Sequence, residues 1–374
     1  MNPKKLGFGL MRLPLTDSAD STSIDHEAVC QMADSFLEAG FTYFDTAAPY
    51  HNSHSETAFR ECVAKRYPRN AYTITNKLSL FMVQKAEELE NFFAGQLERC
   101  GVDYFDYYLL HAMNKDYLDL AEKIGAFDFA AQKKAEGKIK HVGFSFHSSA
   151  EVLDEILTKH PEMEYVQLQL NYIDWEDEEV QSRKCYEVCV KHDKPVIVME
   201  PVKGGSLANV PEEAERLFRE KQPELSTASW GIRFAASLPH VLVVLSGMSN
   251  MEQVEDNTSY MADFQPLTPD ELDTVKQVAG IIRSQITVDC AACGACTAQC
   301  PKNIPMAAYF DMYNEHCQMG KYSNGMVYYA NFPTGTGKAS ECDGCGKCET
   351  VCPKKLPIRE LLGEVKSAFE WSMV

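Results

Sequence analysis

Residues 290–301 read CAACGACTAQCP, and residues 342–353 read CDGCGKCETVCP. Each is a C-x2-C-x2-C-x3-C-P run, a spacing with which cysteine thiolates hold [4Fe-4S] clusters. Where such runs come in pairs, the fourth cysteine of each binds the cluster of the other run. The runs therefore predict two [4Fe-4S] clusters in one folded module. We expect one cluster on Cys290, Cys293, Cys296 and Cys352, and the other on Cys342, Cys345, Cys348 and Cys300.

Zinc is the alternative metal for these cysteines, because zinc ribbons also contain paired C-x2-C motifs. A zinc site takes four ligands, and it needs neither a third cysteine nor a C-P pair in each run. The complete runs therefore favour iron–sulfur clusters.

Upstream of the cysteine runs, from residue 6 to residue 283, β-rich runs alternate with amphipathic helical stretches. This alternation is typical of a parallel sheet with helices between its strands. The strand candidates are residues 6–11, 41–46, 72–77, 105–111, 140–146, 164–170, 195–201 and 241–246. Eight such units close a (β/α)8 TIM barrel of about 250 residues. We predict an α/β chain, with a barrel over residues 1–283 and a small, mainly helical ferredoxin-like two-cluster domain over residues 284–374.

Helix signals occur in both predicted domains. Apolar residues recur at helical spacing before Gly40, and a second helical interval over 83–100 ends at Gly101. Thr268 to Glu271 form a capping box that predicts a helix to about residue 283.

Between the cysteine runs, residues 306–319 are helix-like and a loose stretch includes residues 332–337. The tail carries apolar residues on one helical face, which predicts a helix packed on the barrel or on the module. These residues are Ile358, Leu361, Leu362, Val365 and Phe369.

Charge and hydropathy exclude several classes of partner. The formal net charge of the 374 residues is -18, and residues 284–374 hold 8 basic and 9 acidic side chains, so nearly all of this charge lies on the barrel. Such an acidic surface repels nucleic acid and anionic membranes. The sequence shows no signal-peptide pattern and no apolar run of about 18 residues, so we expect no membrane segment.

Cysteine usage bears on the compartment. Of the 14 cysteines, 6 lie outside the two runs and are expected to be free thiols, mostly buried in helices: Cys30, Cys62, Cys100, Cys185, Cys189 and Cys317. Clusters and free thiols together favour a reducing cytoplasm.

Four polar residues stand at or just after the carboxyl ends of barrel strands, where TIM barrels place functional side chains. They are Asp45, Tyr50, Lys77 and His111. Each also has a structural interpretation: a helix cap, a surface aromatic ring, a solvated charge and a loop histidine, respectively.

The motifs that contain these residues resemble successive signatures of the aldo/keto reductase family. They are GFTYFDTAAPY at 40–50, HSE at 54–56, TITNK at 73–77 and DYYLLH at 106–111. Further matches are GFS at 143–145, Gln167, and SGMSNMEQVEDN at 246–257. The resemblance covers about residues 6–262, and with the cysteine runs the chain is similar to the iron–sulfur branch of the family.

The resemblance implies a catalytic tetrad. Tyr50 would protonate a carbonyl oxygen as hydride arrives, and Lys77 would make the phenol proton more available, because a free phenol has a pKa of about 10. Asp45 would pair with Lys77, and His111 would orient the carbonyl group.

The resemblance also implies contacts for NADPH or NADH. Ser145 and Gln167 would hold the nicotinamide carboxamide, and four residues would contact the adenosine half: Gly247, Ser249, Gln253 and Asn257. Residues 246–257 contain no Lys or Arg, so this segment does not favour NADPH over NADH. Phe146 replaces the usual Asn, and Met199 and Glu200 replace the usual aromatic residue, which implies an altered nicotinamide pocket.

The function expected from the resemblance is a cytoplasmic oxidoreductase that interconverts a small-molecule carbonyl and an alcohol, with two clusters that transfer electrons, for example with a ferredoxin. Hydride carries two electrons, whereas a cubane cluster ordinarily passes one. One alternative is therefore a ferredoxin-linked reductase that delivers single electrons to a barrel-bound substrate without nicotinamide. A second alternative is a non-catalytic redox sensor or binding module.

Overall fold

The computed structural model describes residues 4–177, 180–284, 287–291, 293–319, 329 and 335–370. Residues 332–334 of the predicted loose stretch lie outside this part of the chain, as do residues 285 and 286 at the predicted domain junction.

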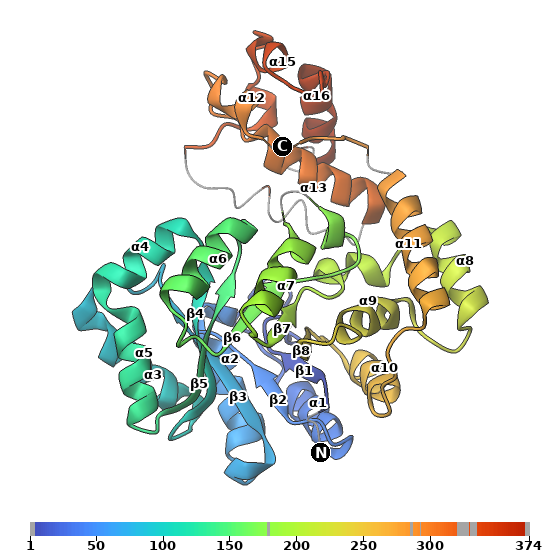
Figure 1. The fold of residues 1–374 in the computed structure, drawn as a ribbon. Coiled ribbons are helices and arrows are strands. Elements are labelled where there is room, and N and C mark those ends of the chain that lie inside the picture. The colour runs from blue at the N-terminus through green and yellow to red at the C-terminus, as the bar shows by residue number, and fades with distance from the viewer. Residues whose placement is uncertain are drawn as a thin grey trace. The chain divides into compact units, whose positions relative to one another are not determined.

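In the described residues, eight parallel strands close a barrel in chain order, with β1 pairing β8 (Figure 1). Strands buried on both faces read as apolar runs, as β8 does with VLVVLS. The strands are β1 Leu6–Gly9, β2 Tyr43–Asp45, β3 Thr73–Ser79, β4 Phe105–Met113, β5 Ile139–Phe146, β6 Tyr165–Gln169, β7 Val196–Met199 and β8 Val241–Ser246. The predicted (β/α)8 barrel is confirmed.

Helices follow the strands around the barrel (Figure 1). They are α1 His26–Glu38, α2 His54–Phe59, α3 Leu89–Cys100, α4 Lys115–Ile124, α5 Ala126–Ala135, α6 Ala150–Lys159, α7 Ser182–Lys191, α9 Thr227–Ala236 and α10 Met251–Met261. Two further helices, α8 Glu212–Lys221 and α11 Pro269–Ser284, lie wholly or mainly in the second of the two units described below. Gly101 ends α3 in the left-handed conformation that glycine adopts without strain, with a φ of 66°. The capping box is also present, since Thr268 N–H donates to Glu271 Oε2 and Glu271 N–H to Thr268 Oγ1.

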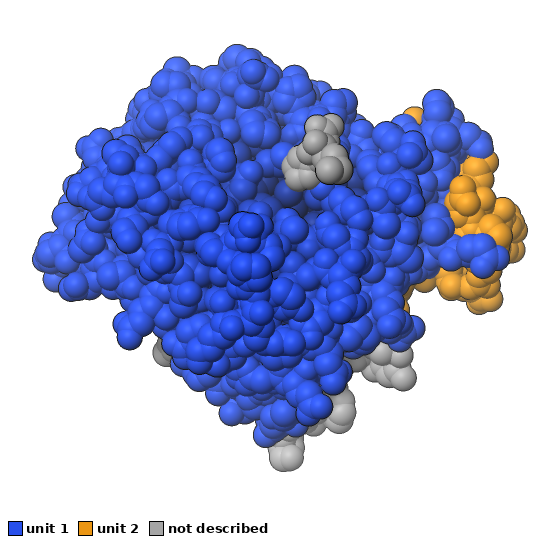
Figure 2. Space-filling model, turned by 90° about the horizontal axis from the view of Figure 1, so that it is seen from below, with its two compact units in different colours: residues 1–203, 224–273 blue, residues 204–223, 274–374 orange. Residues whose placement is uncertain are grey.

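The chain divides into two compact units, which Figure 2 colours separately. The first unit comprises residues 1–203 and 224–273, and the second comprises residues 204–223 and 274–374. The barrel strands all belong to the first unit, and both cysteine runs belong to the second. The boundary that we predict at residue 283 stays a prediction.

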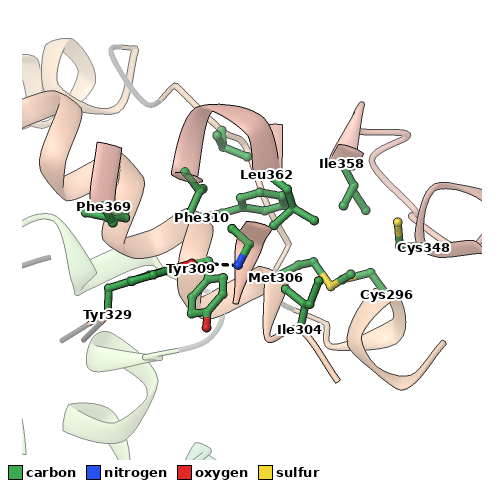
Figure 3. Packing of buried hydrophobic residues seen from close by; sticks show 13 residues of the cluster. Cys296, Ile304, Met306, Tyr309, Phe310, Tyr329, Cys348, Ile358, Leu362 and Phe369 are labelled. Atoms are coloured by element: carbon green, nitrogen blue, oxygen red, sulfur yellow. Dashed lines mark hydrogen bonds between the residues drawn. The ribbon is translucent and has the colours of Figure 1, made fainter. Parts of the chain in front are cut away.

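The second unit has its own apolar core around the cysteine runs (Figure 3). Its helices after α11 are α12 Ala295–Ala298, α13 Met306–Met319, α15 Lys347–Thr350 and α16 Ile358–Phe369. The predicted helices at 306–319 and in the tail are confirmed as α13 and α16. Ile358, Leu362, Val365 and Phe369 of α16 are buried in this core. In Figure 3, Phe369 lies at one end of the cluster, and Ile358 lies with Cys296 and Cys348 at the other.

Two of the cysteines that we expected to be free form a disulfide. Cys30 of α1 is bonded to Cys62, which lies in a π-helical turn, Arg60–Ala64, that continues α2. The two residues are 32 positions apart, and the packing of α1 against this turn brings them together. Local periodicity cannot show that two residues this far apart in the sequence face each other. Cys100, Cys185, Cys189 and Cys317 are free, as predicted.

Within the described residues, we find no helix whose length and apolar character would suffice to cross a membrane.

Candidate functional site

An ion pair lies at the carboxyl end of the barrel, on strands β2 and β3. Lys77 Nζ lies 2.5 Å from Asp45 Oδ1 and donates to the Thr46 carbonyl oxygen at 2.9 Å. Only 1% of the Lys77 side chain is exposed. Burial lowers the pKa of Lys77, but the Asp45 carboxylate and the Tyr50 phenol raise it more, so this pKa lies above its usual value. The barrel thus holds a fixed ammonium charge.

Tyr50 lies against this charge. Lys77 Nζ is 4.8 Å from the centroid of the Tyr50 ring. Burial raises the pKa of Tyr50, and the Lys77 charge opposes that rise without cancelling it. The phenol therefore keeps its proton at neutral pH, with a cation placed to stabilise the phenolate once the proton leaves.

The turn that presents Tyr50 has an unusual backbone. His51, Asn52 and Ser53 have φ values of 49°, 51° and 69°, a left-handed run that side-chain-bearing residues seldom adopt. Hydrogen bonds hold it: His51 Nε2 accepts from Leu13 N–H at 3.2 Å, His51 Nδ1 bonds the Ser21 carbonyl oxygen at 2.7 Å, and Ser53 Oγ donates to the Ala48 carbonyl oxygen at 2.9 Å. Strained backbone of this kind is concentrated at functional sites.

His111 also lies close to Tyr50. The two ring centroids are 6.4 Å apart in an edge-to-face arrangement, and Ser79 Oγ is 2.9 Å from His111 Nδ1. Burial, followed by the charge of Lys77, lowers the pKa of His111 to about 3, so the imidazole is neutral at physiological pH. We predicted that Lys77 and His111 would be the last residues of their strands. This is wrong, because β3 and β4 each continue for two more residues.

A buried polar network, which motif reading alone missed, supports β3 behind Lys77. Glu56 of α2 accepts from Asn76 Nδ2 at 2.7 Å and from Arg99 Nε. Asn76 Oδ1 accepts from Lys77 N–H at 2.8 Å, and Gln96 Nε2 donates to the Lys77 carbonyl oxygen at 2.9 Å. The sequence signal that could have revealed this network is the glutamate of the HSE motif, which stands next to an apolar run.

Ser145 and Gln167 lie opposite each other on the paired strands β5 and β6. Ser145 Oγ accepts from Ala112 N–H at 2.8 Å, and Gln167 Nε2 donates to Asp45 Oδ2 at 3.2 Å. These bonds leave the Ser145 hydroxyl proton to donate and the Gln167 amide oxygen to accept. This pair is complementary to a carboxamide, which offers one acceptor and one amino donor.

The segment expected to bind adenosine forms the β8 end and the start of α10. Ser249 N–H donates to Gln253 Oε1 at 2.7 Å, and Ser249 Oγ donates to the Arg12 carbonyl oxygen at 2.7 Å. Asn257 is 4% exposed, donates to Ser246 Oγ at 2.8 Å and accepts from Tyr260 OH at 2.6 Å. In this structure, Asn257 therefore joins α10 to β8.

A pocket of about 230 Å³ opens at the carboxyl ends of β5 and β6. Its lining is partly apolar and partly polar, formed by Phe146, His147, Ser148, Leu168, Gln169, Val180 and Cys185. Phe146, which replaces a polar residue, belongs to this pocket. Burial raises the pKa of Cys185 to about 12, so this thiol remains protonated.

In the second unit, a recess brings together the four cysteines that we assigned to the first cluster. Cys290, Cys293, Cys296 and Cys352 line it, together with apolar side chains that include Phe310 and Ile358. Four convergent thiols in an apolar setting fit a [4Fe-4S] cluster.

Three of the four cysteines assigned to the other cluster belong to the same core or pack against it. Cys348 is buried in the core of the second unit, and Cys300 and Cys342 pack against it, while Cys345 is exposed. Among the described residues, no group of three His, Cys, Asp or Glu side chains could hold a single metal ion. A cubane cluster differs from such a single-ion site, because each of its four thiolates binds a different iron.

The sequence model of the Aldo/keto reductase family matches residues 5–279. The chain belongs to this family. A model of the 4Fe-4S dicluster domain matches residues 289–356, so both resemblances drawn from the sequence motifs are confirmed.

Relatives in the aldo/keto reductase family share the barrel at low identity. An aldo-keto reductase of Gibberella moniliformis is 29% identical over 153 residues, which are 39% of this chain and only 44% of that relative's length. L-galactose dehydrogenase of Arabidopsis thaliana is 23% identical over 298 residues, covering 74% of this chain and 90% of that protein.

Solved structures of aldo/keto reductases show the same fold. An aldo-keto reductase from Klebsiella pneumoniae in complex with NADPH has a TM-score of 0.57 and 18% identity, and the match covers 75% of this chain and 96% of that one. The holo form of an aldo-keto reductase from Bacillus halodurans has a TM-score of 0.59 and 23% identity, covering 73% and 91%.

Proposed function

We propose that this aldo/keto reductase interconverts a small-molecule carbonyl and an alcohol at Asp45, Tyr50, Lys77 and His111, with a nicotinamide nucleotide as hydride carrier. The observation that carries the proposal is the protonated Tyr50 phenol beside the buried Lys77–Asp45 pair and the neutral His111. This is the set of groups that proton transfer to a carbonyl oxygen requires.

Each residue has one part in the reduction. Bound reduced nicotinamide would supply the hydride to the carbonyl carbon. Tyr50 donates its proton to the carbonyl oxygen, and Lys77 stabilises the phenolate that forms. Asp45 holds Lys77 in place. In this scheme Ser79 Oγ donates to His111 Nδ1, so that the neutral His111 would carry its proton on Nε2 and donate it to the same carbonyl oxygen.

The nucleotide contacts are part of the proposal. The Ser145 hydroxyl and the Gln167 amide oxygen would bind the carboxamide, and the segment from Gly247 to Asn257 would bind the adenosine half. The NADPH complex of the relative from Klebsiella pneumoniae supports this choice of cofactor.

We further propose that residues 284–374 form the dicluster domain, with two [4Fe-4S] clusters ligated as the cysteine runs predict. The recess lined by Cys290, Cys293, Cys296 and Cys352 supports the crossed pairing. The clusters would exchange single electrons with a partner such as ferredoxin in the cytoplasm. Neither nucleic acid nor a membrane enters this scheme.

A second candidate, a reductase that uses cluster electrons without nicotinamide, is favoured by one observation. Met199 and Glu200 stand where the resemblance implies a stacking aromatic residue, and the Glu200 carboxylate contributes to the raised pKa of Tyr50, after burial and Asp45. Neither a methionine nor a glutamate side chain offers an aromatic stacking surface to a nicotinamide ring.

Anaerobic assays of the intact protein separate the candidates. A panel of small aldehydes and ketones would be tested with NADPH, NADH or reduced ferredoxin as the donor. Nucleotide-dependent turnover is expected. Turnover with reduced ferredoxin by a protein that neither binds nor oxidises nicotinamide would establish the second candidate instead.

Tyr50→Phe tests the proton donor itself. Turnover is expected to fall by roughly 10²- to 10⁴-fold, the usual contribution of general acid catalysis, while nucleotide affinity is retained. Tyr67→Phe, which removes a phenol bound to Asp34 on the outer surface, is the matched control and should keep full activity. Equal activity of both variants would refute catalysis by Tyr50, and biological activity that survives Tyr50→Phe would favour the sensor alternative.

A further inference from the structure

Arg12 lies in the loop between β1 and α1, against the segment proposed to bind adenosine. Its carbonyl oxygen accepts from Ser249 Oγ at 2.7 Å, across 237 positions of sequence. Its side chain runs along Gly247: a Cβ built on that glycine would lie 3.5 Å from Arg12 Cδ and 3.7 Å from Arg12 Cβ and Cγ. Arg12 therefore lines the β8 end, which holds no cation of its own between Ser246 and Asn257.

The next residue joins the same loop to the catalytic turn. Leu13 N–H donates to His51 Nε2 at 3.2 Å, and His51 follows Tyr50 directly. Arg12 and Leu13 thus bridge the two ends of the proposed nucleotide site. A dinucleotide with its nicotinamide near Tyr50 and its adenosine near Ser249 would have its phosphates between these points, and the Arg12–Leu13 segment contacts both of them.

The guanidinium of Arg12 differs in its pairing from the other arginines of the first unit. Six of them have a carboxylate partner: Arg60, Arg66, Arg69, Arg99, Arg183 and Arg233. Among the residues that the structure describes, no hydrogen bond or ion pair engages the Arg12 guanidinium. In a chain of net charge -18, a half-buried arginine without an acidic partner is available for an anion from outside.

We propose that Arg12 binds a phosphate group of the nicotinamide nucleotide and thereby supplies the cation that residues 246–257 lack. This inference rests on the nucleotide-dependent function proposed above. Guanidinium suits the role because its planar fork makes paired hydrogen bonds to phosphate oxygens.

Titration calorimetry of the intact, anaerobically purified protein with NADPH and with NADH tests the assignment. Arg12→Gln should raise the Kd by roughly 10- to 100-fold, the scale of a lost charge-assisted contact. Arg12→Lys should lie between wild type and Arg12→Gln, because it keeps the charge and loses the fork. Arg183→Gln removes the same charge from α7, where Arg183 pairs with Glu176 and Glu187, and should leave the Kd unchanged.

The two nucleotides identify the phosphate. Loss of affinity for both assigns Arg12 to the pyrophosphate, and loss for NADPH alone assigns it to the 2′-phosphate. Wild-type affinity should also weaken with added salt more steeply than that of Arg12→Gln, a difference that a purely structural role would not produce.

The outcomes separate this inference from the proposed function. Arg12→Gln with wild-type affinity for both nucleotides would overturn the inference and leave the reductase proposal intact. Wild-type protein that binds neither nucleotide would overturn both. The bond from Ser249 uses the backbone of Arg12, so the substitution should not change the melting temperature of the protein without nucleotide.

Discussion

His111 shows at the residue scale how burial decides a chemical role. An exposed imidazole has a pKa near 6.5, but burial and the charge of Lys77 lower that of His111 to about 3. The imidazole is therefore neutral at physiological pH, and its protonation cannot shape the pH profile of activity near neutrality.

The same shift predicts how stability depends on pH. Between about pH 6.5 and 3 the unfolded chain binds a proton at this histidine and the folded chain does not. The contribution of His111 to the unfolding free energy is therefore fully present above about pH 6.5 and is lost as pH falls through this range. From about pH 7 to about pH 5, this site should cost about 2 kcal/mol of unfolding free energy, at about 1.4 kcal/mol for each unit below the unfolded pKa.

Urea unfolding of wild type and His111→Gln at these two pH values measures that cost. The variant should lose less stability than wild type on acidification, while His147, whose pKa burial also lowers, stays in both proteins as an internal reference. An equal loss in the two proteins would show that His111 titrates normally.

At the scale of elements, α2 is tied to β3 by the buried carboxylate of Glu56. It accepts from Asn76, next to Lys77 in β3, and from Arg99 in α3. Asn76 in turn accepts from Lys77 N–H. This network fixes the strand that carries the Lys77 ammonium group.

Glu56→Ala should therefore lower the unfolding free energy by about 2 to 4 kcal/mol, because it leaves a buried amide and a partly buried guanidinium without their partner. Glu61→Ala is a matched control in the turn that follows α2. Glu61 pairs with Arg60 and Lys65 at the surface, so its loss should cost less than about 1 kcal/mol. Urea unfolding compares the two, and similar losses would contradict a structural role for the network.

At the scale of the whole molecule, the second unit is a small domain whose core includes its cysteines. Val288, Phe310 and Ile358 are buried together with Cys296 and Cys348. Intact protein should contain about eight irons per chain, four for each cubane.

Paired substitutions test which cysteines share a cluster. Cys293→Ser combined with Cys352→Ser should leave about four irons, because both residues would serve one cubane. Cys293→Ser combined with Cys300→Ser should disrupt both clusters. Iron counts with paramagnetic resonance of the reduced protein decide the matter, and the reverse result would establish uncrossed pairing.

The sequence alone predicted those elements and ligand sets whose signals lie within a short stretch of the chain. Strand runs, the Thr268–Glu271 capping box and the glycine that ends α3 are local signals, since each depends on residues within a few positions of one another. The cysteine runs are local in the same sense, because four ligands with fixed spacing identify a cluster module before any fold is known.

Only the tertiary structure decided which distant residues meet. It brought Arg12 against Gly247, joined Cys30 to Cys62, and placed Ser145 opposite Gln167. It also made His111 neutral, through burial. The physical reason is barrel closure, because β1 meets β8 only when all the strands have paired. The burial, charge and contacts where these two strands meet depend on residues more than 200 positions apart. No local sequence pattern records such contacts.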